Sequence, residues 1–530
     1  MARALALVNG RVYTQEHASP RGQAVGVVGN RIAAVGSNEA ALDVVGASAD
    51  RIDLHGRTVI PGFVDAHFHL LAYCLSRERL QLEGAETLES ALGLVGQAAV
   101  AAPPRAWVVG RGWDRNLWPG AAFPSRHDLD RVARGRPVFL LSRDAHAVWV
   151  NTAAVELAGI GRDTPDPPGG RILREPNGTP SGILLEEAGR PLRELADQPS
   201  LEASVASLHE GQDALLRLGV TAVHSFEGAR AFEALQVLDS RGELRLRVFA
   251  GLPSHVLAAA SRIGLRTGFG SQRLRVGLLK LFADGALGSG TAAMLAPYTD
   301  SAETNDRGIA RLELEELIGL MREAREAGIG VAIHAIGDAA VRSVLDAAET
   351  VRSEEPGRQQ ILRIEHAQLV DPDDLGRFGR LDVVASMQPL HVTSDMRIAD
   401  RRWGSRCRTA YPWRSVLEAG ARLAFGTDCP VEPPDPFRGV HAAATRQLPD
   451  GDPPGGWHPE QRLTVPEAVR AYTLGSADAA GLAHEHGSVA TGKLADLLVL
   501  SADPYAIPPE ELFGISVEMT IFDGQVVYAM

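Results

Sequence analysis

The sequence contains very little cysteine, since only Cys74, Cys407 and Cys429 occur among its 530 residues. No two of them are spaced as a C-x-x-C pair, so the chain offers neither a disulfide framework nor a cysteine zinc site. Three free thiols fit a reducing compartment, and we expect a cytoplasmic protein. The first residues are too short an apolar run for a signal-peptide core, and no later stretch reaches the roughly 18 uncharged apolar residues that a membrane helix needs.

Basic charge is also in short supply. Lys and Arg total 53 against 66 Asp and Glu, which gives a net charge of −13. Because this net field repels a phosphate backbone, we expect no nucleic-acid partner and no membrane partner. The 45% hydrophobic and 22% charged content is typical of a globular protein. The length predicts two to four structural units, and a homo-oligomer is compatible with the sequence, which leaves the oligomeric state open.

The two ends of the chain have a similar pattern of short alternating strands. Residues 1–58 contain such runs around turn signals, including Asn9-Gly10, and residues 486–530 contain others around Asp523-Gly524. We therefore predict that the two ends share one β domain.

Between the ends, residues 59–485 contain eight short apolar runs that are each followed by an amphipathic stretch. This alternation predicts eight βα units, which is typical of a (β/α)8 barrel. The eight runs are Val59 to Asp65, Val220 to Phe226, Arg247 to Gly251, Leu274 to Phe282, Ile329 to His334, Leu362 to His366, Val383 to Gln388, and Leu423 to Asp428.

A long interval, about residues 75–205, separates the first two predicted barrel strands, and we interpret it as an insertion. It holds four of the seven tryptophans in a chain with only 5% aromatic residues, namely Trp107, Trp113, Trp118 and Trp149. An insertion after strand one leaves the barrel near the strand's carboxyl end. The indole rings therefore predict an apolar wall over the barrel mouth, or alternatively the insertion's own small core.

Polar groups end several of the predicted barrel strands. On the first strand, a period of two places Asp65, His67 and His69 on one face, which predicts either a pair of metal-ligating imidazoles or buried core histidines that are hydrogen-bonded. On the fourth, Lys280 lies within an apolar run. A buried ammonium needs compensation, so three outcomes stay open: a Schiff-base lysine, an ion pair with Asp284, or a lysine carbamylated by carbon dioxide that bridges metals.

Three more such groups follow the fifth, sixth and eighth predicted strands: His334, His366 and Asp428. Taken alone, Asp428 could be a helix cap. Because barrels gather the carboxyl ends of their strands at one mouth, all of these groups are expected to converge there. Mixed nitrogen and oxygen ligands suit borderline divalent metals such as zinc.

This arrangement resembles the amidohydrolase superfamily, with a split β-sandwich, a (β/α)8 barrel, and H-x-H, lysine, histidine and aspartate positions on the corresponding strands. The segments Val59 to His67, Asp284-Gly285, Gly487 to Val489, Lys493 to Leu497, Trp113-Asp114 and His146 to Asn151 are similar to amidohydrolase family 3, the group that contains N-substituted formamide deformylase. The resemblance implies two zinc ions. His67 and His69 would hold one, His334 and His366 the other, a carbamate on Lys280 would bridge them, and Asp428 would be ligand and base.

We therefore predict an enzyme that hydrolyses a non-peptide carbon–nitrogen bond in a small-molecule amide or N-substituted formamide. The alternatives are a deaminase or cyclic-amide hydrolase of the same superfamily, a Schiff-base lyase using Lys280, and a non-catalytic metal-bound barrel with a binding or regulatory role. Candidate substrate contacts, for which ordinary packing is the alternative, are Trp113, Arg143, His146, His224 and Gln388.

Overall fold

A computed structural model describes residues 4–103, 105–196, 198–300, 305–357 and 360–530. Its central element is an eight-stranded parallel sheet, in which each strand pairs with the strand of the same sheet that follows it in the sequence. The strands are β8 (Phe63–Phe68), β15 (Val220–Ser225), β16 (Arg247–Pro253), β17 (Leu274–Phe282), β18 (Val331–Ala335), β19 (Leu362–His366), β20 (Val384–Met387) and β21 (Leu423–Phe425).

The first and last strands meet just beyond their carboxyl ends. Asp428 N donates to His67 O at 2.7 Å, and His69 N donates to Cys429 O at 2.9 Å. A parallel bridge joins Phe68 to Cys429. The predicted (β/α)8 barrel is thus confirmed, and these backbone bonds bring its first and last strands together among the residues that the sequence singles out.

Helices on the outside of the sheet bury one apolar face each. In α11, buried residues recur three and four positions apart, as at Val341, Val344, Leu345 and Ala348, which is the spacing of a helix packed on a core. The strand β17 is apolar throughout except at two positions, as expected for a strand covered on both faces. The principal outer helices are α7 (Leu201–Arg217), α8 (Ala229–Ser240), α9 (Leu257–Arg262), α10 (Leu314–Ala327), α11 (Asp338–Glu354), α12 (Pro372–Arg380), α13 (Pro389–Trp403), α14 (Trp413–Glu418), α15 (Pro436–Thr445) and α16 (Val465–Arg470).

The first predicted barrel strand is wrong in one respect, because the run from Val59 to Asp65 divides at Gly62. Its first half, β7 (Thr58–Pro61), pairs with β22 (Leu497–Leu500) and β2 (Arg11–Tyr13) in a terminal sheet, and only β8 belongs to the barrel. A Cβ at Gly62 would lie 2.2 Å from Thr221 Oγ1, so the chain can cross between the two sheets at this position only with glycine.

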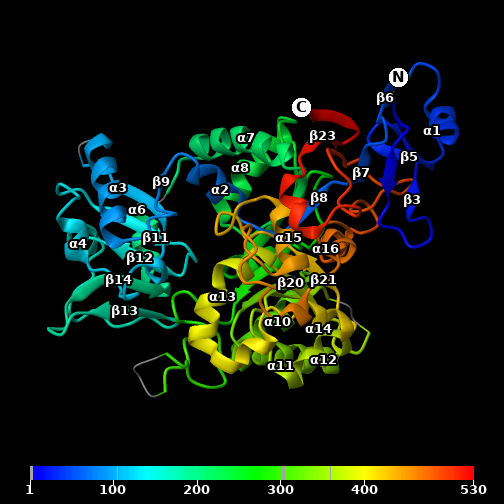
Figure 1. Cartoon of the computed structure of the whole chain (residues 1–530). Coiled ribbons are helices and arrows are strands. Elements are labelled where there is room, and N and C mark those ends of the chain that lie inside the picture. The colour runs from blue at the N-terminus through cyan, green and yellow to red at the C-terminus, as the bar shows by residue number, and fades with distance from the viewer. Residues whose placement is uncertain (1–3, 104, 197, 301–304, 358–359) are drawn as a thin grey trace.

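The termini form two sheets that share one core. The first is β1 (Ala4–Val8), β4 (Ala24–Val28), β5 (Arg31–Gly36) and β6 (Asp50–Asp53), with α1 (Asn38–Val45) packed on it; the second is β2 (Arg11–Tyr13), β3 (Arg21–Gly22), β7, β22 (Leu497–Leu500), β23 (Val517–Phe522) and β24 (Gln525–Ala529). Leu7 and Val27 from one end pack with Val499 and Ile521 from the other. This confirms the predicted split β domain, and Figure 1 shows both chain ends on the same side of the barrel.

The segment between β8 and β15 begins with α2 (Leu70–Ser76) and then forms a six-stranded mixed sheet of its own. This sheet lies on the side of the barrel away from the terminal sheets (Figure 1). Its elements are β9 (Leu80–Gln81), α3 (Leu88–Ala101), β10 (Val108–Trp113), α4 (Arg126–Asp130), β11 (Val138–Ser142), β12 (Ala147–Val150), α5 (Thr152–Leu157), β13 (Gly170–Arg174), β14 (Pro180–Glu186) and α6 (Arg190–Ala196).

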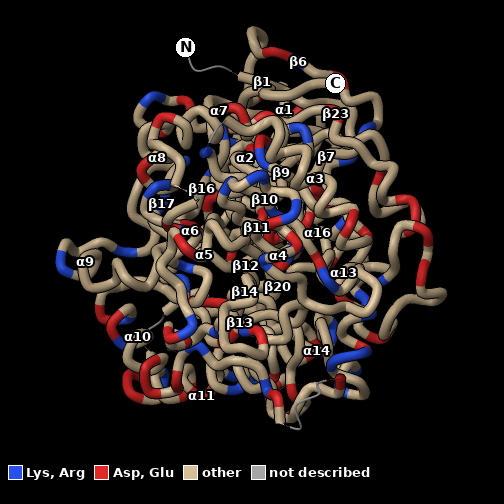
Figure 2. The backbone as a smooth tube through the Cα atoms, turned by 90° about the vertical axis from the view of Figure 1, so that its left-hand side faces the viewer, with Lys and Arg blue, Asp and Glu red and all other residues tan. Residues whose placement is uncertain are grey.

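Acidic and basic residues are interspersed along the whole chain, as Figure 2 shows, and no basic face stands out in that view. Among the described residues, no helix combines the length and the apolar character that a membrane crossing demands.

Candidate metal centre

The carboxyl ends of β8 and β21 carry one group of metal-competent side chains. The Nε2 atoms of His67 and His69 lie 3.5 and 3.2 Å from Oδ1 of Asp428. The remaining ring nitrogens face acceptors, since Nδ1 of His67 donates to Glu365 Oε2 and Nδ1 of His69 donates to Phe226 O, both at 2.7 Å. Each Nδ1 therefore carries the proton, and both Nε2 lone pairs point at one place beside Asp428.

Asp65 links the ends of these two strands by hydrogen bonds. Its carboxylate accepts hydrogen bonds from Thr427 Oγ1 at 2.6 Å, Thr427 N at 3.0 Å and His67 N at 3.1 Å. Asp65 thus has a structural role that connects the ends of β8 and β21. The sequence period places it on the same face as the two histidines, but its carboxylate is used by these hydrogen bonds.

A second group lies at the ends of β18 and β19. The rings of His334 and His366 have their centroids 4.5 Å apart. Nδ1 of His366 faces Gln388 Oε1 at 2.8 Å, and Nε2 of His334 faces Gly285 O at 2.9 Å, which leaves one lone pair free on each ring. Burial lowers the pKa of both rings well below the usual histidine value, so both are neutral and able to ligate a metal.

Lys280 lies between the two groups, with 6% of its surface exposed. Within the described part of the chain, its Nζ has no hydrogen-bond partner and lies 4.9 Å from the ring centroids of both Phe226 and Phe282. Burial lowers the pKa of Lys280 to about 8. A buried amine without a partner is energetically costly. A carbamate formed on this amine would be an anion whose two oxygens could each ligate a metal ion. The residues therefore fit a carbamylated lysine.

The alternative ion pair between Lys280 and Asp284 is not formed. The carboxylate of Asp284 accepts backbone hydrogen bonds from Ala293, Ile336 and Gly337 at 2.9, 3.0 and 2.8 Å. Asp284 thus organises the loops after β17 and β18 and leaves the lysine unpaired.

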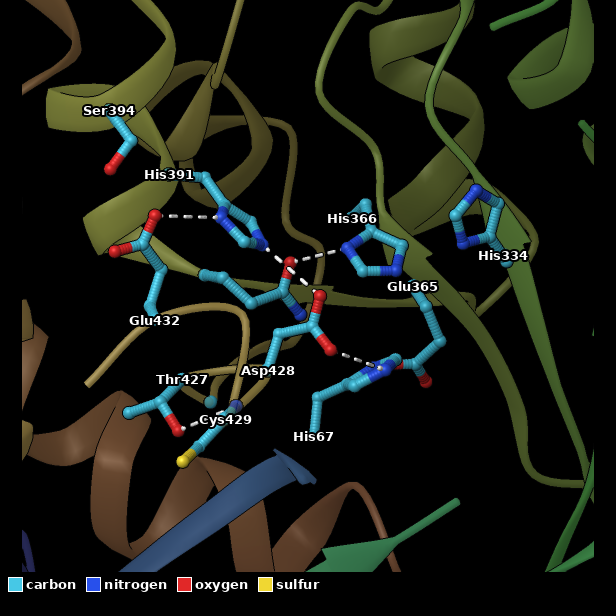
Figure 3. A network of polar contacts seen from close by, with 12 residues as sticks. His67, His334, Glu365, His366, His391, Ser394, Thr427, Asp428, Cys429 and Glu432 are labelled. Atoms are coloured by element: carbon cyan, nitrogen blue, oxygen red, sulfur yellow. Dashed lines mark hydrogen bonds and ion pairs between the residues drawn. The ribbon is translucent and has the colours of Figure 1, made fainter. Parts of the chain in front are cut away.

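Asp428 occupies the middle of the site (Figure 3). Its backbone has a φ of +58°, a left-handed conformation that a non-glycine residue adopts at a cost. Burial alone would raise the pKa of its carboxyl group, but the His67 ring and the hydrogen bond from His391 outweigh burial and hold the pKa well below its usual range. Asp428 is therefore an anion, with Oδ1 toward His67 and His69 and Oδ2 toward His391, and it is no helix cap.

Two charged residues beneath the site escaped the sequence analysis. Arg363 and Glu365 are fully buried on β19, and Arg363 Nε donates to Glu365 Oε1 at 2.8 Å. Glu365 in turn orients His67. Burial alone would raise the pKa of Glu365, but Arg363 and His67 keep it well below the usual range. The signal was present, because a parallel strand reading Leu-Arg-Ile-Glu-His buries two opposite charges two residues apart.

His391, near the start of α13, was also missed. Its Nε2 lies 3.3 Å from Asp428 Oδ2 and its Nδ1 lies 3.6 Å from Glu432 Oε1. Burial alone would lower its pKa, but the hydrogen bonds to these two carboxylates outweigh burial and raise the pKa to about 10. His366, His391 and Asp428 form a further combination of possible metal ligands, with ligand atoms within 4.8 Å of one another.

The five candidate substrate contacts fall in different places. Trp113, Arg143 and His146 border a cavity that also exposes His334, His366 and Asp428. Trp113 is only 2% exposed, however, and its ring packs against Trp118 and Trp149 with centroids 6.2 and 5.9 Å away. The structure thus favours the alternative that these tryptophans form the insertion's own core.

The other two candidates, Gln388 and His224, contact residues of the site but not its cavity. Gln388 holds the ring of His366, as described above. Nδ1 of His224 accepts a hydrogen bond from Arg363 Nη1 at 2.7 Å, and His224 lines a separate small cavity with Arg247 and His486. Neither side chain lines the cavity at the barrel mouth.

This cavity continues beneath the insertion as a space of about 260 Å³ bordered by ligand candidates of both groups and by Lys280. Residues of the insertion close it from the opposite side. Glu186 at the end of β14 contacts His146 Nδ1 at 2.8 Å and Thr291 Oγ1 at 2.6 Å, so the insertion is hydrogen-bonded to the loop after β17.

Comparison with known proteins decides what this arrangement belongs to. The amidohydrolase family profile matches residues 50–528. The chain belongs to the amidohydrolase family. This amidohydrolase is 31% identical to the N-substituted formamide deformylase of Arthrobacter pascens, over 99% of this chain and 98% of that protein. It is 31% identical to protein LONG AFTER FAR-RED 3 of Arabidopsis thaliana, over 94% and 88%.

Among solved structures, the amidohydrolase matches an uncharacterized metal-dependent hydrolase from Pyrococcus horikoshii with a TM-score of 0.78 and 32% identity, over 96% of this chain and 99% of that one. Family membership makes the chain a hydrolase of this superfamily. Its histidine and aspartate groups are suited to a divalent metal.

Proposed function

We propose that this amidohydrolase cleaves a non-peptide carbon–nitrogen bond in a small-molecule amide or N-substituted formamide, and that it uses two zinc ions and a carbamylated Lys280. The observation that carries the proposal is the buried, unpaired Nζ of Lys280 between two groups of oriented histidines. The similarity to a formamide deformylase over nearly the whole chain supports the choice of bond.

Each half of the site has its own ligands. His67 and His69, together with Asp428, would hold one ion, and His334 and His366 would hold the other. The carbamate on Lys280 would reach both halves from below. When bound, divalent metal lowers the pKa of a water molecule toward neutrality and polarises the carbonyl oxygen of the substrate.

The residues of the chain then supply the proton transfers. Asp428 takes a proton from the attacking water, whose oxygen bonds to the carbonyl carbon. When the carbon–nitrogen bond breaks, Asp428 returns the proton to the departing nitrogen, so that the products are a carboxylic acid and an amine. The carboxylate suits this role because it is anionic, buried and bordered by the cavity.

A combined metal analysis and substrate screen tests the proposal. Protein purified without chelator should contain two divalent ions per chain, and a panel of N-formyl, N-acyl and cyclic amides should include compounds that release an amine. Release of ammonia from an aminated ring would instead indicate a deaminase, and borohydride trapping of a carbonyl compound on Lys280 would indicate the lyase. Metal-loaded protein that turns over none of the panel would favour a binding role.

A further inference from the structure

An arginine of the insertion reaches the barrel. Arg143 lies directly after β11, and its Nη2 donates to Glu432 Oε1 at 2.9 Å and to Ser394 Oγ at 2.7 Å. Glu432 belongs to the segment after β21, whereas Ser394 lies on α13. One guanidinium group therefore joins the insertion to the two barrel segments that border Asp428.

The contact continues inward to Asp428. Glu432 is 5% exposed and lies 3.6 Å from Nδ1 of His391, which is also 5% exposed. Nε2 of His391 lies 3.3 Å from Oδ2 of Asp428, as Figure 3 shows. The four side chains form an unbroken series of polar contacts, from Arg143 through Glu432 and His391 to Asp428.

The two oxygens of Asp428 are used differently. Oδ1 faces Nε2 of His67 and His69, and Oδ2 faces His391. The contact with His391 therefore restricts rotation of the Asp428 carboxylate about the Cβ–Cγ bond. Among the described residues, Oδ2 contacts His391, so loss of this ring would leave the carboxylate free to rotate in the cavity that Asp428 borders.

We propose that Arg143 is a positioning residue of the insertion, which orients Asp428 through Glu432 and His391 and so completes the reactive site. This inference rests on the proposed function, in which Asp428 transfers the proton. It gives Arg143 a role different from the substrate contact that the sequence predicts. Nη2 of Arg143 is already shared by Glu432 and Ser394, and the inference assigns this atom to the protein rather than to the substrate.

The position of Arg143 comes from the fold of the insertion. Its backbone N donates to Trp113 O at 2.9 Å. The adjacent Asp144 accepts from Ser289 Oγ at 2.6 Å, across the boundary between the insertion and the loop after β17. The guanidinium is therefore delivered to Glu432 only when the insertion is docked on the barrel.

The experiment compares Arg143→Met, Arg143→Lys, Glu432→Gln and the double variant Arg143→Met/Glu432→Gln in the full-length, metal-loaded enzyme. The control is Arg131→Met, because Arg131 is an exposed arginine of the same insertion that pairs with Asp128 at 3.1 Å, outside the cavity. Activity is measured on the best amide of the screen, together with the melting temperature.

If the inference is correct, Arg143→Met lowers kcat by about 10²-fold, the usual cost of misplacing a reacting group, and leaves KM close to that of the control. Its melting temperature falls because Glu432 is left buried without its cation, and the double variant recovers that stability but not kcat. Arg143→Lys keeps the charge and recovers part of kcat. The double variant is no slower than the slower single variant, because both changes break the same series.

Two results would overturn the inference: a rise in KM with unchanged kcat, which marks a substrate contact, or fully additive losses in the double variant. A second readout does not need turnover. The visible spectrum of cobalt(II)-substituted enzyme should change in Arg143→Met and stay unchanged in Arg131→Met, and identical spectra would contradict the inference. If the wild type cleaves no amide, the proposed function fails, but the spectra still test the series.

Discussion

The cavity has two walls that are built in different ways. The barrel wall presents its groups from the ends of consecutive parallel strands, and nearly every one of them is held by a second residue, as Glu365 holds His67 and Gln388 holds His366. The insertion wall presents groups from a separate mixed sheet, and these groups mainly contact other protein side chains, as Arg143 does with Glu432 and His146 with Glu186.

This difference suggests that the two walls control different properties, the barrel wall the type of reaction and the insertion wall the choice of substrate. Groups fixed on barrel strands define which chemistry takes place, because their relative positions are set by the closed sheet. Groups on the insertion define what fits above them, and they can change without disturbing the ligands. Changes in the barrel wall should therefore lower turnover for every substrate alike, whereas changes in the insertion wall should alter stability, positioning or preference.

The largest effect is expected for Lys280→Ala. Mutation of an outer partner of a metal ligand costs about 10- to 100-fold in metal affinity or activity, so loss of the proposed bridging carbamate should lower turnover by more than about 10²-fold and should release metal. Acetate or propionate, which fit the vacated space, should restore part of both. Elemental analysis and turnover with and without the added acid measure this, with Lys493→Ala in the terminal β domain as control.

A fully active Lys280→Ala enzyme would rule out the bridging carbamate. It would also remove the main support for two ions, because the two histidine groups would then act without a shared ligand.

The barrel wall was largely predictable from the sequence, and the reason is physical. A histidine, lysine or aspartate at the end of an apolar strand has few structural uses, so His67, Lys280 and Asp428 stand out against their neighbours. His391 did not stand out because it lies inside a helix, where one polar residue every turn is ordinary. The contact between Arg143 and Glu432 could not be predicted at all, since the two residues lie 289 positions apart in the sequence.

The next largest effect should come from Asp428→Asn. The amide keeps the shape of the side chain and its contact with His391 but cannot take a proton, so the rate should fall by about 10²- to 10⁴-fold. The measurement is kcat at full metal loading, confirmed by elemental analysis, together with the melting temperature. Unchanged turnover at full loading would remove Asp428 from the proton transfer.

A smaller effect is expected for Glu365→Gln, which tests how the barrel wall holds its ligands. The glutamine loses the negative charge that orients Nδ1–H of His67, and metal affinity should fall by about 10- to 100-fold. Competition with a chelator of known affinity measures the change. Glu349→Gln is the matched control, because Glu349 is an exposed glutamate that pairs with Arg377 on the outer helices. Equal affinities in the two variants would show that His67 needs no such support.

The smallest effect on catalysis is expected for Trp113→Ala in the insertion wall. Trp113 is buried with Trp118 and Trp149, and its Nε1 donates to Leu140 O at 3.0 Å. Truncation of a buried large aromatic usually costs about 3 to 5 kcal/mol of unfolding free energy. Denaturant titration should therefore show a large loss of stability, while the ranking of amide substrates by kcat/KM stays as in the wild type.

Phe123→Ala provides the contrast within the same insertion. Phe123 also borders the cavity, but it is only half-buried and lies beneath the Arg115 guanidinium, 3.9 Å from its ring centroid. Its truncation should cost less stability than that of Trp113 and should change the substrate ranking, because an exposed apolar surface of the cavity is removed. If Trp113→Ala instead changes the ranking without loss of stability, then Trp113 acts as a wall of the cavity. The distinction drawn here between the core of the insertion and its cavity-facing surface would then fail at that residue.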